Sequence, residues 1–270
     1  MQTFGLIGKK LTHSFSKRYF TEKFEKENIK DCTYELFEMP TIEHFPELIK
    51  QQPTLKGLNV TIPYKLEVLP FLHQIDPAAQ RIGAVNVIKV CEDGKLIGYN
   101  SDYYGFKTSL LSFLGTSSVL SVQTQTTAEK NIKALILGTG GASKAVKVAL
   151  EDLQIPYIFV RRELSVVTQT TVGGDLLTYA QLTESIIKEH LLIINTTPLG
   201  MYPQVEACPE IPYQFLTTNH YLYDLVYNPE NTLFMQKGQA QGAKTINGLP
   251  MLYLQAEKSW KIWNSIEYLS

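Results

Sequence analysis

Two short polar segments of the sequence combine residues that can transfer a proton with residues that can bind hydroxyl groups. The segment NVTIPYK carries Asn59, Thr61 and Lys65 at the end of an expected strand, and the segment GYNSD carries Asp102 after another. Ligands bind outside the carboxyl ends of parallel strands, so we expect both segments to line one crevice. Neutral amides and hydroxyls can satisfy a polyol, whereas Lys65 and Asp102 supply an acid and a base. The pattern is typical of a site that delivers a proton to a ketone oxygen as charge develops on it.

A glycine-rich segment, GTGGAS, predicts a phosphate-binding turn. Gly138, Gly140 and Gly141 stand between the apolar run KALIL and the helical pattern KAVKVALEDL, where the N–H groups of a helix N-terminus can contact a pyrophosphate. The next expected strand, PYIFV, is followed by Arg161 and Arg162, at the place where NAD sites carry an acidic residue. Two guanidinium groups suit the additional phosphate of NADP. The sequence therefore favours NADP(H) over NAD as the cofactor.

The elements that must position these residues alternate between strands and helices. TFGLIG, CTYELFEM and LNVT read as strands, and aromatic residues recur at helical spacing between positions 15 and 24. This alternation favours a mainly parallel sheet covered by helices. Asp76 followed by Pro77 predicts a helix start, and Asp93-Gly94 predicts a hairpin between VNVIKV and KLIGYN.

The second half of the chain repeats the alternation. The βαβ pattern around GTGGAS has the length of a dinucleotide-binding half, LLIIN and YLYDLVY predict later strands, and LPMLYLQAEKSWKIW predicts a C-terminal helix. Residues 115–131 are rich in Ser, Thr and Gln and predict an exposed loop. The segment of residues 163–182 is short for the βα unit expected there, rich in β-forming residues and poor in helix signals. The sequence therefore predicts a remodelled segment at this place. We expect a substrate domain of residues 1–104 plus 247–270 and a dinucleotide-binding domain of residues 105–246.

Composition and charge exclude several classes of function. Lys and Arg number 25 against 26 Asp and Glu, so the chain has no positive excess to hold nucleic acid. No apolar run approaches the roughly 20 residues that a membrane-spanning helix needs, and the N-terminus has no export pattern. We therefore expect a cytoplasmic protein that binds neither nucleic acid nor a membrane. Cys32, Cys91 and Cys208 are odd in number and widely spaced, which predicts neither a disulfide nor a metal site.

The motifs taken together resemble one family. SFS after His13, NVTIPYK, GAVN, GYNSD, GTGGAS, NTTPLGM, DLVYNP and NGLPMLYLQA follow one another as in the shikimate dehydrogenase family, across nearly the whole chain. The resemblance implies NADPH-dependent reduction of 3-dehydroshikimate to shikimate, in the shikimate pathway of aromatic amino-acid biosynthesis. It implies an α/β protein of two domains: a mainly parallel N-terminal substrate domain and a Rossmann-type dinucleotide-binding domain. The C-terminal helix is expected to pack back on the first domain, and the sequence leaves monomer and homodimer open.

The resemblance also assigns roles to single residues. Lys65 is implied as the proton donor to the ketone and Asp102 as the group that holds the ammonium and a substrate hydroxyl. Ser14 and Ser16 are implied at the substrate carboxylate. The implied substrate-binding residues are Ser14, Ser16, Asn59, Thr61, Asn86, Tyr227 and Gln255. The implied cofactor-binding residues are Gly138, Gly140, Gly141, Ala142, Arg161, Arg162, Thr196, Leu225 and Gly248.

Simpler alternatives exist for some of these residues. The glycine turn could merely join strand to helix, and Glu163 could pair with Arg162 on the surface. Thr61 and Ser14 could be helix caps, and Leu225 and Tyr227 could belong to the core.

The sequence departs from the family pattern at two places. Val160, Arg161 and Arg162 replace the usual Asn-Arg-Thr, and Ser101 replaces a Thr before Asp102. The first change removes an Asn at the adenosine end of the cofactor, whereas the second keeps a hydroxyl.

The sequence is also compatible with three rival functions. One is a quinate/shikimate dehydrogenase with relaxed cofactor use. Another is a non-catalytic sensor that binds dinucleotide or shikimate. The third is a folate-linked dehydrogenase. Arg161 and Arg162 argue against NAD, the retained Lys65 and Asp102 argue against a sensor, and the SFS and GYNSD motifs fit a polyol acid better than a pteridine.

Overall fold

A computed structural model describes residues 1–11, 14–115, 132–162 and 176–265 of the chain. The chain divides into two compact units: unit 1 comprises Met1–Asp102 and Leu254–Ser270, and unit 2 comprises Tyr103–Tyr253. Both divisions fall inside helices, α5 (Ser101–Phe113) and α9 (Leu249–Asn264). The predicted loop at residues 115–131 lies outside the described part except for its first residue, as does most of the segment at residues 163–182.

Unit 1 contains a six-stranded sheet with strand order β2-β1-β3-β5-β6-β4. Its strands are β1 (Gln2–Gly8), β2 (Cys32–Glu38), β3 (Leu55–Val60), β4 (Gln74–Ile75), β5 (Val87–Val90) and β6 (Leu96–Tyr99). Its helices are α1 (Phe15–Lys26), α2 (Phe45–Gln51), α3 (Tyr64–Glu67) and α4 (Pro77–Ile82), together with the ends of α5 and α9. Only β5 runs antiparallel to its neighbours, β3 and β6, which confirms a mainly parallel sheet.

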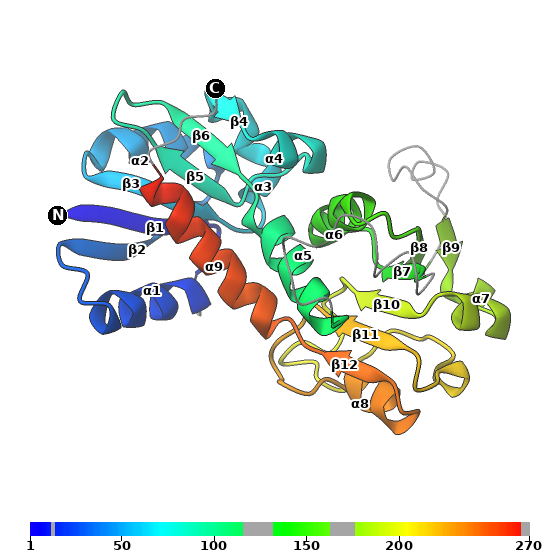
Figure 1. The fold of residues 1–270 in the computed structure, drawn as a ribbon. Coiled ribbons are helices and arrows are strands. Elements are labelled where there is room, and N and C mark those ends of the chain that lie inside the picture. Colours follow the sequence, from blue (N-terminus) through cyan, green and yellow to red (C-terminus); the bar gives the residue numbers. More distant parts are fainter. Residues whose placement is uncertain (12–13, 116–131, 163–175, 266–270) are drawn as a thin grey trace. The chain divides into compact units, whose positions relative to one another are not determined.

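Both faces of this sheet are buried, because apolar side chains alternate along its strands. On β1, Phe4 and Leu6 pack with α1 and α9, whereas Ile7 packs with α2, α3 and α4 on the opposite face (Figure 1). The Trp263 ring on α9 stacks on Phe4 with 5.0 Å between ring centroids. Gly57 on β3 lets this helix approach closely, because a Cβ there would overlap the Trp263 indole. The C-terminal helix therefore packs on the first domain, as predicted.

Two local signals of the sequence have the expected geometry. The Asp76 carboxylate accepts hydrogen bonds from the backbone N–H groups of Ala78 and Ala79 and so caps α4. Strands β5 and β6 pair as an antiparallel hairpin whose turn contains Gly94 at φ +80°, a backbone conformation that favours glycine.

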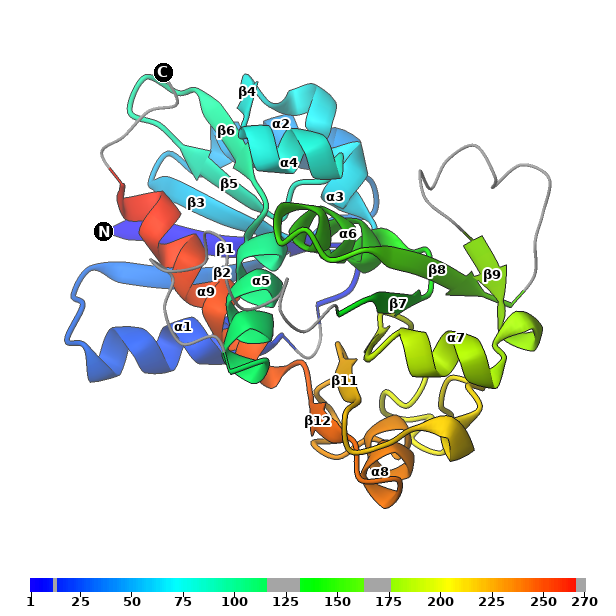
Figure 2. The same ribbon diagram turned by 45° about the vertical axis from the view of Figure 1, so that its right-hand side comes forward.

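Unit 2 contains a six-stranded sheet in which every pair of strands is parallel, with order β12-β11-β10-β7-β8-β9. Its strands are β7 (Ala134–Leu137), β8 (Tyr157–Arg161), β9 (Leu176–Thr178), β10 (Leu192–Asn195), β11 (Tyr221–Asp224) and β12 (Lys244–Ile246). Its helices are α6 (Gly141–Asp152), α7 (Glu184–Glu189) and α8 (Leu233–Ala240), with the remaining parts of α5 and α9. This is the strand order of the Rossmann fold, whose direction of winding reverses between β7 and β10. Figure 2 shows β7, β8 and β9 as neighbouring strands of this sheet.

The strands of unit 2 read as continuous apolar runs because both faces are covered. Ala134 and Ile136 of β7 pack with α5 and α6, and Leu135 and Leu137 pack with α7 and α8. All four of these side chains are fully buried. The remodelled segment predicted at residues 163–182 is described only from residue 176, where the three-residue strand β9 is followed by a single 3-10 turn.

No helix among the described residues is long and apolar enough to cross a membrane. Cys32, Cys91 and Cys208 are free thiols. The described ranges contain no group of three His, Cys, Asp or Glu side chains placed to hold a metal ion.

Candidate active site

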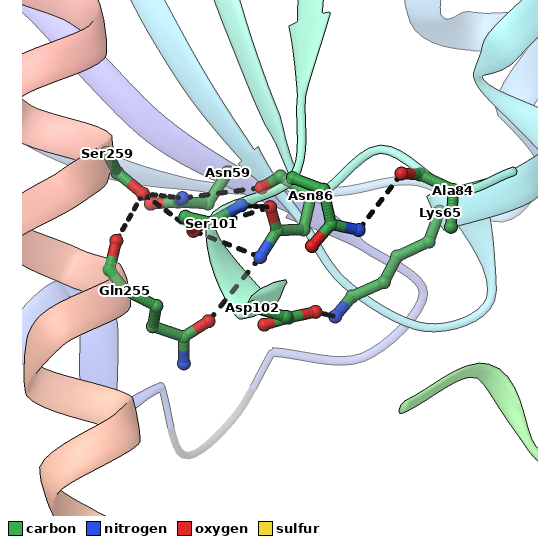
Figure 3. A network of polar contacts seen from close by, with 9 residues as sticks. Asn59, Lys65, Ala84, Asn86, Ser101, Asp102, Gln255 and Ser259 are labelled. Carbon is green, nitrogen blue, oxygen red and sulfur yellow. Dashed lines mark hydrogen bonds and ion pairs between the residues drawn. The ribbon is translucent and has the colours of Figure 1, made fainter. Parts of the chain in front are cut away.

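Lys65 and Asp102 form an ion pair in unit 1, although 37 positions separate them in the sequence. Lys65 lies on α3 just after β3, and Asp102 lies in the first turn of α5 just after β6 (Figure 3). The Lys65 Nζ is 2.7 Å from the Asp102 Oδ2, and the two side chains are 29% and 11% exposed. The pair is therefore largely shielded, yet the ammonium remains within reach of a ligand and of solvent.

The short helix α3 is held in place by its neighbours rather than by its own length. Tyr64 is buried, and its hydroxyl donates a 2.6 Å hydrogen bond to the carbonyl of Met39. The Lys65 carbonyl accepts a 2.8 Å hydrogen bond from the N–H of Val85. A four-residue helix is not stable alone, so these contacts are what position the Lys65 side chain.

Asp102 is positioned by a buried asparagine. The Oδ1 of Asn86 accepts a 2.7 Å hydrogen bond from the backbone N–H of Ser101, the first residue of α5. The Nδ2 of Asn86 donates to the Ser101 hydroxyl at 3.1 Å, and the side chain of Asn100 donates to the carbonyl of Ala84 at 3.0 Å. These contacts satisfy a free N–H at the start of α5 and fix the turn that carries Asp102.

A second asparagine joins α9 to the sheet. The Nδ2 of Asn59 on β3 donates a 3.0 Å hydrogen bond to the hydroxyl of Ser259, and its Oδ1 accepts a 2.8 Å hydrogen bond from the Tyr34 hydroxyl. Ser259 is in turn 3.3 Å from the Ser101 hydroxyl, and Gln255 accepts from Asn86 through its Oε1 at 3.4 Å. Figure 3 shows the side chains of Asn59, Asn86, Ser101, Gln255 and Ser259 as one continuous network beside the Lys65–Asp102 pair.

The remaining residues expected at the substrate occupy other places in unit 1. The Ser14 hydroxyl caps α1 by accepting a 3.2 Å hydrogen bond from the N–H of Lys17, so the simpler alternative applies to it in this structure. The backbone N–H of Thr61 donates a hydrogen bond to the carbonyl of Ile7, and the Thr61 carbonyl accepts one from the N–H of Tyr64, which closes the turn after β3. No hydrogen bond between described residues joins Ser14 or Thr61 to the network.

Ser16 is linked to the network through Tyr34. Burial raises the pKa of the Tyr34 phenol well above its ordinary value, and a hydrogen bond with Ser16 opposes that rise. Tyr34 therefore stays neutral and can donate to Asn59. Tyr34 and Ser259 are members of the site that the sequence motifs did not indicate.

A cavity of about 530 Å³ opens at the carboxyl ends of the strands of unit 2, where the winding reverses. Residues that follow four different strands line it: Gly138, Thr139, Gly140, Arg161, Arg162, Tyr179, Thr196, Thr197, Pro198 and Leu199. Open sheets of this type bind dinucleotides at this position. Of these residues, Thr139, Thr197, Pro198 and Leu199 lie in the motifs GTGGAS and NTTPLGM without having been assigned to the cofactor, and Tyr179 lies in no motif.

The glycine turn has the geometry of a phosphate-binding loop. Gly138 has φ +103°, and a Cβ at this position would lie 2.8 Å from the Thr197 side chain. Gly140 is the N-cap of the 12-residue helix α6, and no atom lies within 4 Å of a Cβ built on Gly140 or Gly141. Open space beside unpaired helix N–H groups fits a bound pyrophosphate. Ala142 is the second residue of the helix.

The positive end of the cavity contains both predicted arginines. Arg161 ends β8, and Arg162 follows it close to the Tyr179 hydroxyl. Burial raises the pKa of Tyr179 to about 12, although the charge of Arg162 lowers it. A neutral phenol and two guanidinium groups therefore line the same cavity, and each of them can donate hydrogen bonds to a phosphate. The cavity fits NADP(H).

The loop after β10 is held by a buried asparagine and a buried aspartate. Asn195 accepts hydrogen bonds from the N–H and the hydroxyl of Thr197 at 3.0 and 2.6 Å, and it donates to Asp224 at 2.9 Å. Thr196 donates from its hydroxyl to the carbonyl of Leu137 at 2.7 Å. These bonds fix the wall of the cavity beside the glycine turn.

Three further residues expected at the ligands lie in unit 2: Leu225 and Tyr227 follow β11, and Gly248 follows β12. The backbone N–H of Leu225 donates to Asn195, and that of Gly248 donates to Val226. A Cβ on Gly248 would overlap the carbonyl of Leu225, so only glycine permits this approach. None of the three lines the cavity described above, and Tyr227 is 39% exposed.

Comparison with known proteins identifies relatives of the whole chain. Residues 6–88 match the family model of the shikimate dehydrogenase substrate binding domain. A shikimate dehydrogenase (NADP(+)) of Clostridium beijerinckii is 38% identical over 271 residues, which cover 99% of this chain and 93% of that protein. The enzyme of the same name from Desulforamulus reducens is 35% identical and covers 97% of this chain and 89% of that protein.

A solved structure supports the same relationship. The crystal structure of shikimate 5-dehydrogenase from Thermus thermophilus in complex with NADP(H) and shikimate superposes with a TM-score of 0.78 and 28% identity. The match covers 98% of this chain and 94% of that chain.

Proposed function

Since the chain belongs to the shikimate dehydrogenase family, we propose that Lys65 and Asp102 are its catalytic pair. The activity is the NADPH-dependent reduction of 3-dehydroshikimate to shikimate, a step of the shikimate pathway toward aromatic amino acids. The observation that carries the assignment is the 2.7 Å contact between the Lys65 Nζ and the Asp102 Oδ2 at the carboxyl ends of β3 and β6.

In the reducing direction, the Lys65 ammonium donates a proton to the ketone oxygen while the carbonyl carbon receives hydride. NADPH, when bound, supplies that hydride. Asp102 accepts a hydrogen bond from the ammonium and so fixes its direction, and its second oxygen can accept one from a substrate hydroxyl. Lys65 regains its proton from solvent, which the partial exposure of its side chain permits. In the oxidising direction the neutral amine accepts the proton of the alcohol.

We propose that the cavity of unit 2 binds NADP(H). The pyrophosphate would contact Gly140, Gly141 and Ala142 at the N-terminus of α6, and Arg161 with Arg162 would hold the phosphate of the adenosine. The cofactor assignments of Gly138, Thr196, Leu225 and Gly248 are part of this proposal.

We propose that the substrate binds beside the network of unit 1. The assignments of Ser14, Ser16, Asn59, Thr61, Asn86, Tyr227 and Gln255 to the substrate belong to this proposal. All of these residues come from one chain, so a monomer would suffice and a homodimer would carry two copies. The three free thiols and the use of NADPH fit a reducing compartment, which supports the cytoplasm as the place of the reaction.

The assignment of Lys65 is tested by Lys65→Ala. We expect kcat for shikimate oxidation to fall about 100-fold or more, because the proton-transfer group is lost, whereas the Kd for NADPH changes less than about twofold. Steady-state kinetics and a fluorescence titration of NADPH measure the two quantities.

The matched control is Lys95→Ala. Lys95 forms an ion pair with Asp93 at 2.8 Å in the same unit, but at an exposed hairpin. This variant should keep the wild-type kcat. A comparable loss of kcat in both variants, or a loss of NADPH affinity in Lys65→Ala, would contradict the role of Lys65.

A further inference from the structure

Tyr179 lines the cavity of unit 2 together with Arg161 and Arg162, although it comes from a different strand. Strands β8 and β9 run parallel, and their last paired residues are Arg161 and Thr178. The residues that follow them, Arg162 and Tyr179, therefore leave the sheet at the same edge. In this way β9 carries a phenol to the part of the cavity where the two guanidinium groups lie.

The backbone and the ring of Tyr179 are both held in place. Thr178 is the N-cap of the 3-10 turn that begins at Tyr179, and the Oε1 of Gln181 accepts a 2.8 Å hydrogen bond from the Thr178 N–H. The Tyr179 ring packs against the apolar cluster that contains Val160. A tyrosine side chain has only two torsions, so a ring that is already packed loses little conformational entropy when its hydroxyl binds a ligand.

The Tyr179 hydroxyl carries its proton and is free to donate it within the described part of the chain. Burial raises the pKa of Tyr179 to about 12, while the charge of Arg162 lowers it and that of Glu210 raises it. No described residue shares a hydrogen bond with this hydroxyl, and the hydroxyl is not sealed from solvent. One O–H donor is therefore available at the wall of the cavity.

The end of β8 supplies positive charge but no neutral donor. Val160 is apolar and fully buried, and Arg162 is exposed. A long exposed side chain must give up rotamer freedom to bind, and solvent screens its charge. A phosphate monoester presents three terminal oxygens, of which one guanidinium group binds two. A hydroxyl on a packed ring therefore complements the arginines at such a phosphate.

We propose that Tyr179 is a specificity-determining residue for NADP(H): its hydroxyl donates a hydrogen bond to the phosphate on the adenosine ribose, which Arg161 and Arg162 also bind. The inference rests on the proposed function, because it adds a donor to the proposed cofactor site. NAD has a hydroxyl where NADP has this phosphate, and a hydrogen bond to a charged acceptor is the stronger of the two. The Tyr179 hydroxyl therefore favours NADP(H) over NAD(H).

The test is a fluorescence titration of the purified full-length protein with NADPH and with NADH. Tyr179→Phe removes the hydroxyl and keeps the ring and its packing. We expect the Kd for NADPH to rise about tenfold, the effect of one lost hydrogen bond to a charged group, and the Kd for NADH to change less than about twofold. An equal rise for both cofactors would overturn the inference.

Tyr157→Phe is the matched control. Tyr157 begins β8 at the opposite end of the strand from Arg161, and its hydroxyl donates a 3.0 Å hydrogen bond to Glu151. Tyr157 is not among the described residues that line the cavity. This variant should keep the wild-type Kd for both cofactors. A similar rise in the Kd for NADPH in both variants would show a general effect on unit 2 and would count against the role of Tyr179.

A role for the ring alone gives a different pattern. If the ring stacks on the adenine and the hydroxyl binds nothing, Tyr179→Phe keeps both Kd values, whereas Tyr179→Leu raises the Kd for NADPH and for NADH by the same factor. That pattern would overturn the inference, because it assigns no part of the cofactor preference to the hydroxyl.

The outcomes separate this inference from the proposed function. A wild-type protein that binds NADPH more tightly than NADH, with the same preference in Tyr179→Phe, overturns only the role of Tyr179. A wild-type protein that binds both cofactors equally overturns the proposed NADP(H) site itself.

Discussion

At the scale of single residues, we propose that the choice of cofactor depends on the two arginines after β8. Arg161 and Arg162 line the cavity together with Tyr179, and among the described residues that line it there is no carboxylate. An NAD site places an acidic side chain here to accept hydrogen bonds from the ribose hydroxyls. The arginines favour a phosphate at this position, because guanidinium groups bind phosphate through two parallel hydrogen bonds.

We predict that Arg161→Ala raises the KM for NADPH by about 10- to 100-fold, the effect of losing a hydrogen bond between charged groups, and leaves the KM for NADH nearly unchanged. Initial rates with each cofactor at saturating 3-dehydroshikimate measure both constants. Arg18→Ala, at an exposed position of α1, should leave both constants unchanged. An equal rise for NADPH and NADH in Arg161→Ala would show that the side chain does not recognise the phosphate.

Single residues were predictable from sequence where a motif carried them. Lys65 and Asp102 stand in motifs that end strands, so their types and positions indicated one crevice, and the structure joins them. Tyr34, Tyr179 and Ser259 could not be predicted, because a tyrosine within or just after a strand and a serine in a helix are typical of ordinary packing. Only the three-dimensional contacts show that Ser259 connects Asn59 to Ser101.

At the scale of elements, the junction between β11 and α8 contains a buried carboxylate. Asp224 at the end of β11 is fully buried and accepts hydrogen bonds from Asn195 at 2.9 Å, the N–H of Val226 at 3.0 Å and the Thr232 hydroxyl at 2.6 Å. Thr232 is also the N-cap of α8. Burial raises the pKa of Asp224 to about 6, although the three hydrogen bonds lower it.

This pKa predicts a dependence of stability on pH. The pKa of Asp224 rises from 3.8 to about 6 on folding, so the folded state holds the proton more tightly than the unfolded state. The resulting stabilisation is fully present below pH 3.8 and is lost as pH rises toward and through about 6. Across this window the loss is on the order of 3 kcal/mol in the free energy of unfolding.

Asp224→Asn removes that ionisation. The stability of the variant relative to the wild type should therefore increase between pH 4 and pH 7, as measured by urea unfolding followed by far-ultraviolet circular dichroism. Asp93→Asn is the control, because the hydrogen bond from Lys95 lowers the pKa of this exposed carboxyl and its effect has the opposite sign. A difference between Asp224→Asn and wild type that stays constant over the range would contradict the raised pKa.

Most elements were predictable because they carry strong periodicity or clear boundary residues. The apolar runs of β7 and β10 and the capped start of α4 are examples. The two-residue strand β4 and the three-residue strand β9 are too short for a pattern to mark them, and they form by pairing with β6 and β8. Short edge elements of this kind depend on tertiary contacts rather than on local sequence.

At the scale of the whole molecule, the alternation of strands and helices predicted two α/β sheets, each covered on both faces. Both sheets are present, one mixed and one parallel. The exact division of the chain could not be predicted, since α5 and α9 each continue from one unit into the other without a linker. A helix that crosses a boundary between units keeps the helical spacing of its apolar residues, so its sequence does not indicate where one unit ends and the other begins.

The rival functions differ from the proposed one in substrate, cofactor or turnover. A quinate-using enzyme with NAD would use the same catalytic pair, so Lys65 and Asp102 do not distinguish it. A sensor would bind NADP(H) or shikimate without turnover. Because the rivals differ in which substrate and cofactor are turned over, or in whether any turnover occurs, the reaction of the protein with defined substrates and cofactors distinguishes them.

The most direct measurement is the absorbance of reduced nicotinamide at its characteristic band, with the purified protein and shikimate or quinate each combined with NADP or NAD. We predict rapid reduction of NADP with shikimate, and rates about tenfold or more lower in the three other mixtures, as expected when one phosphate or ring contact is lost. Equal rates with NAD would contradict the cofactor specificity argued from Arg161 and Arg162, and equal rates with quinate would favour the quinate-using rival. No reduction in any mixture, with NADPH still bound to the protein, would contradict the enzyme and favour the sensor.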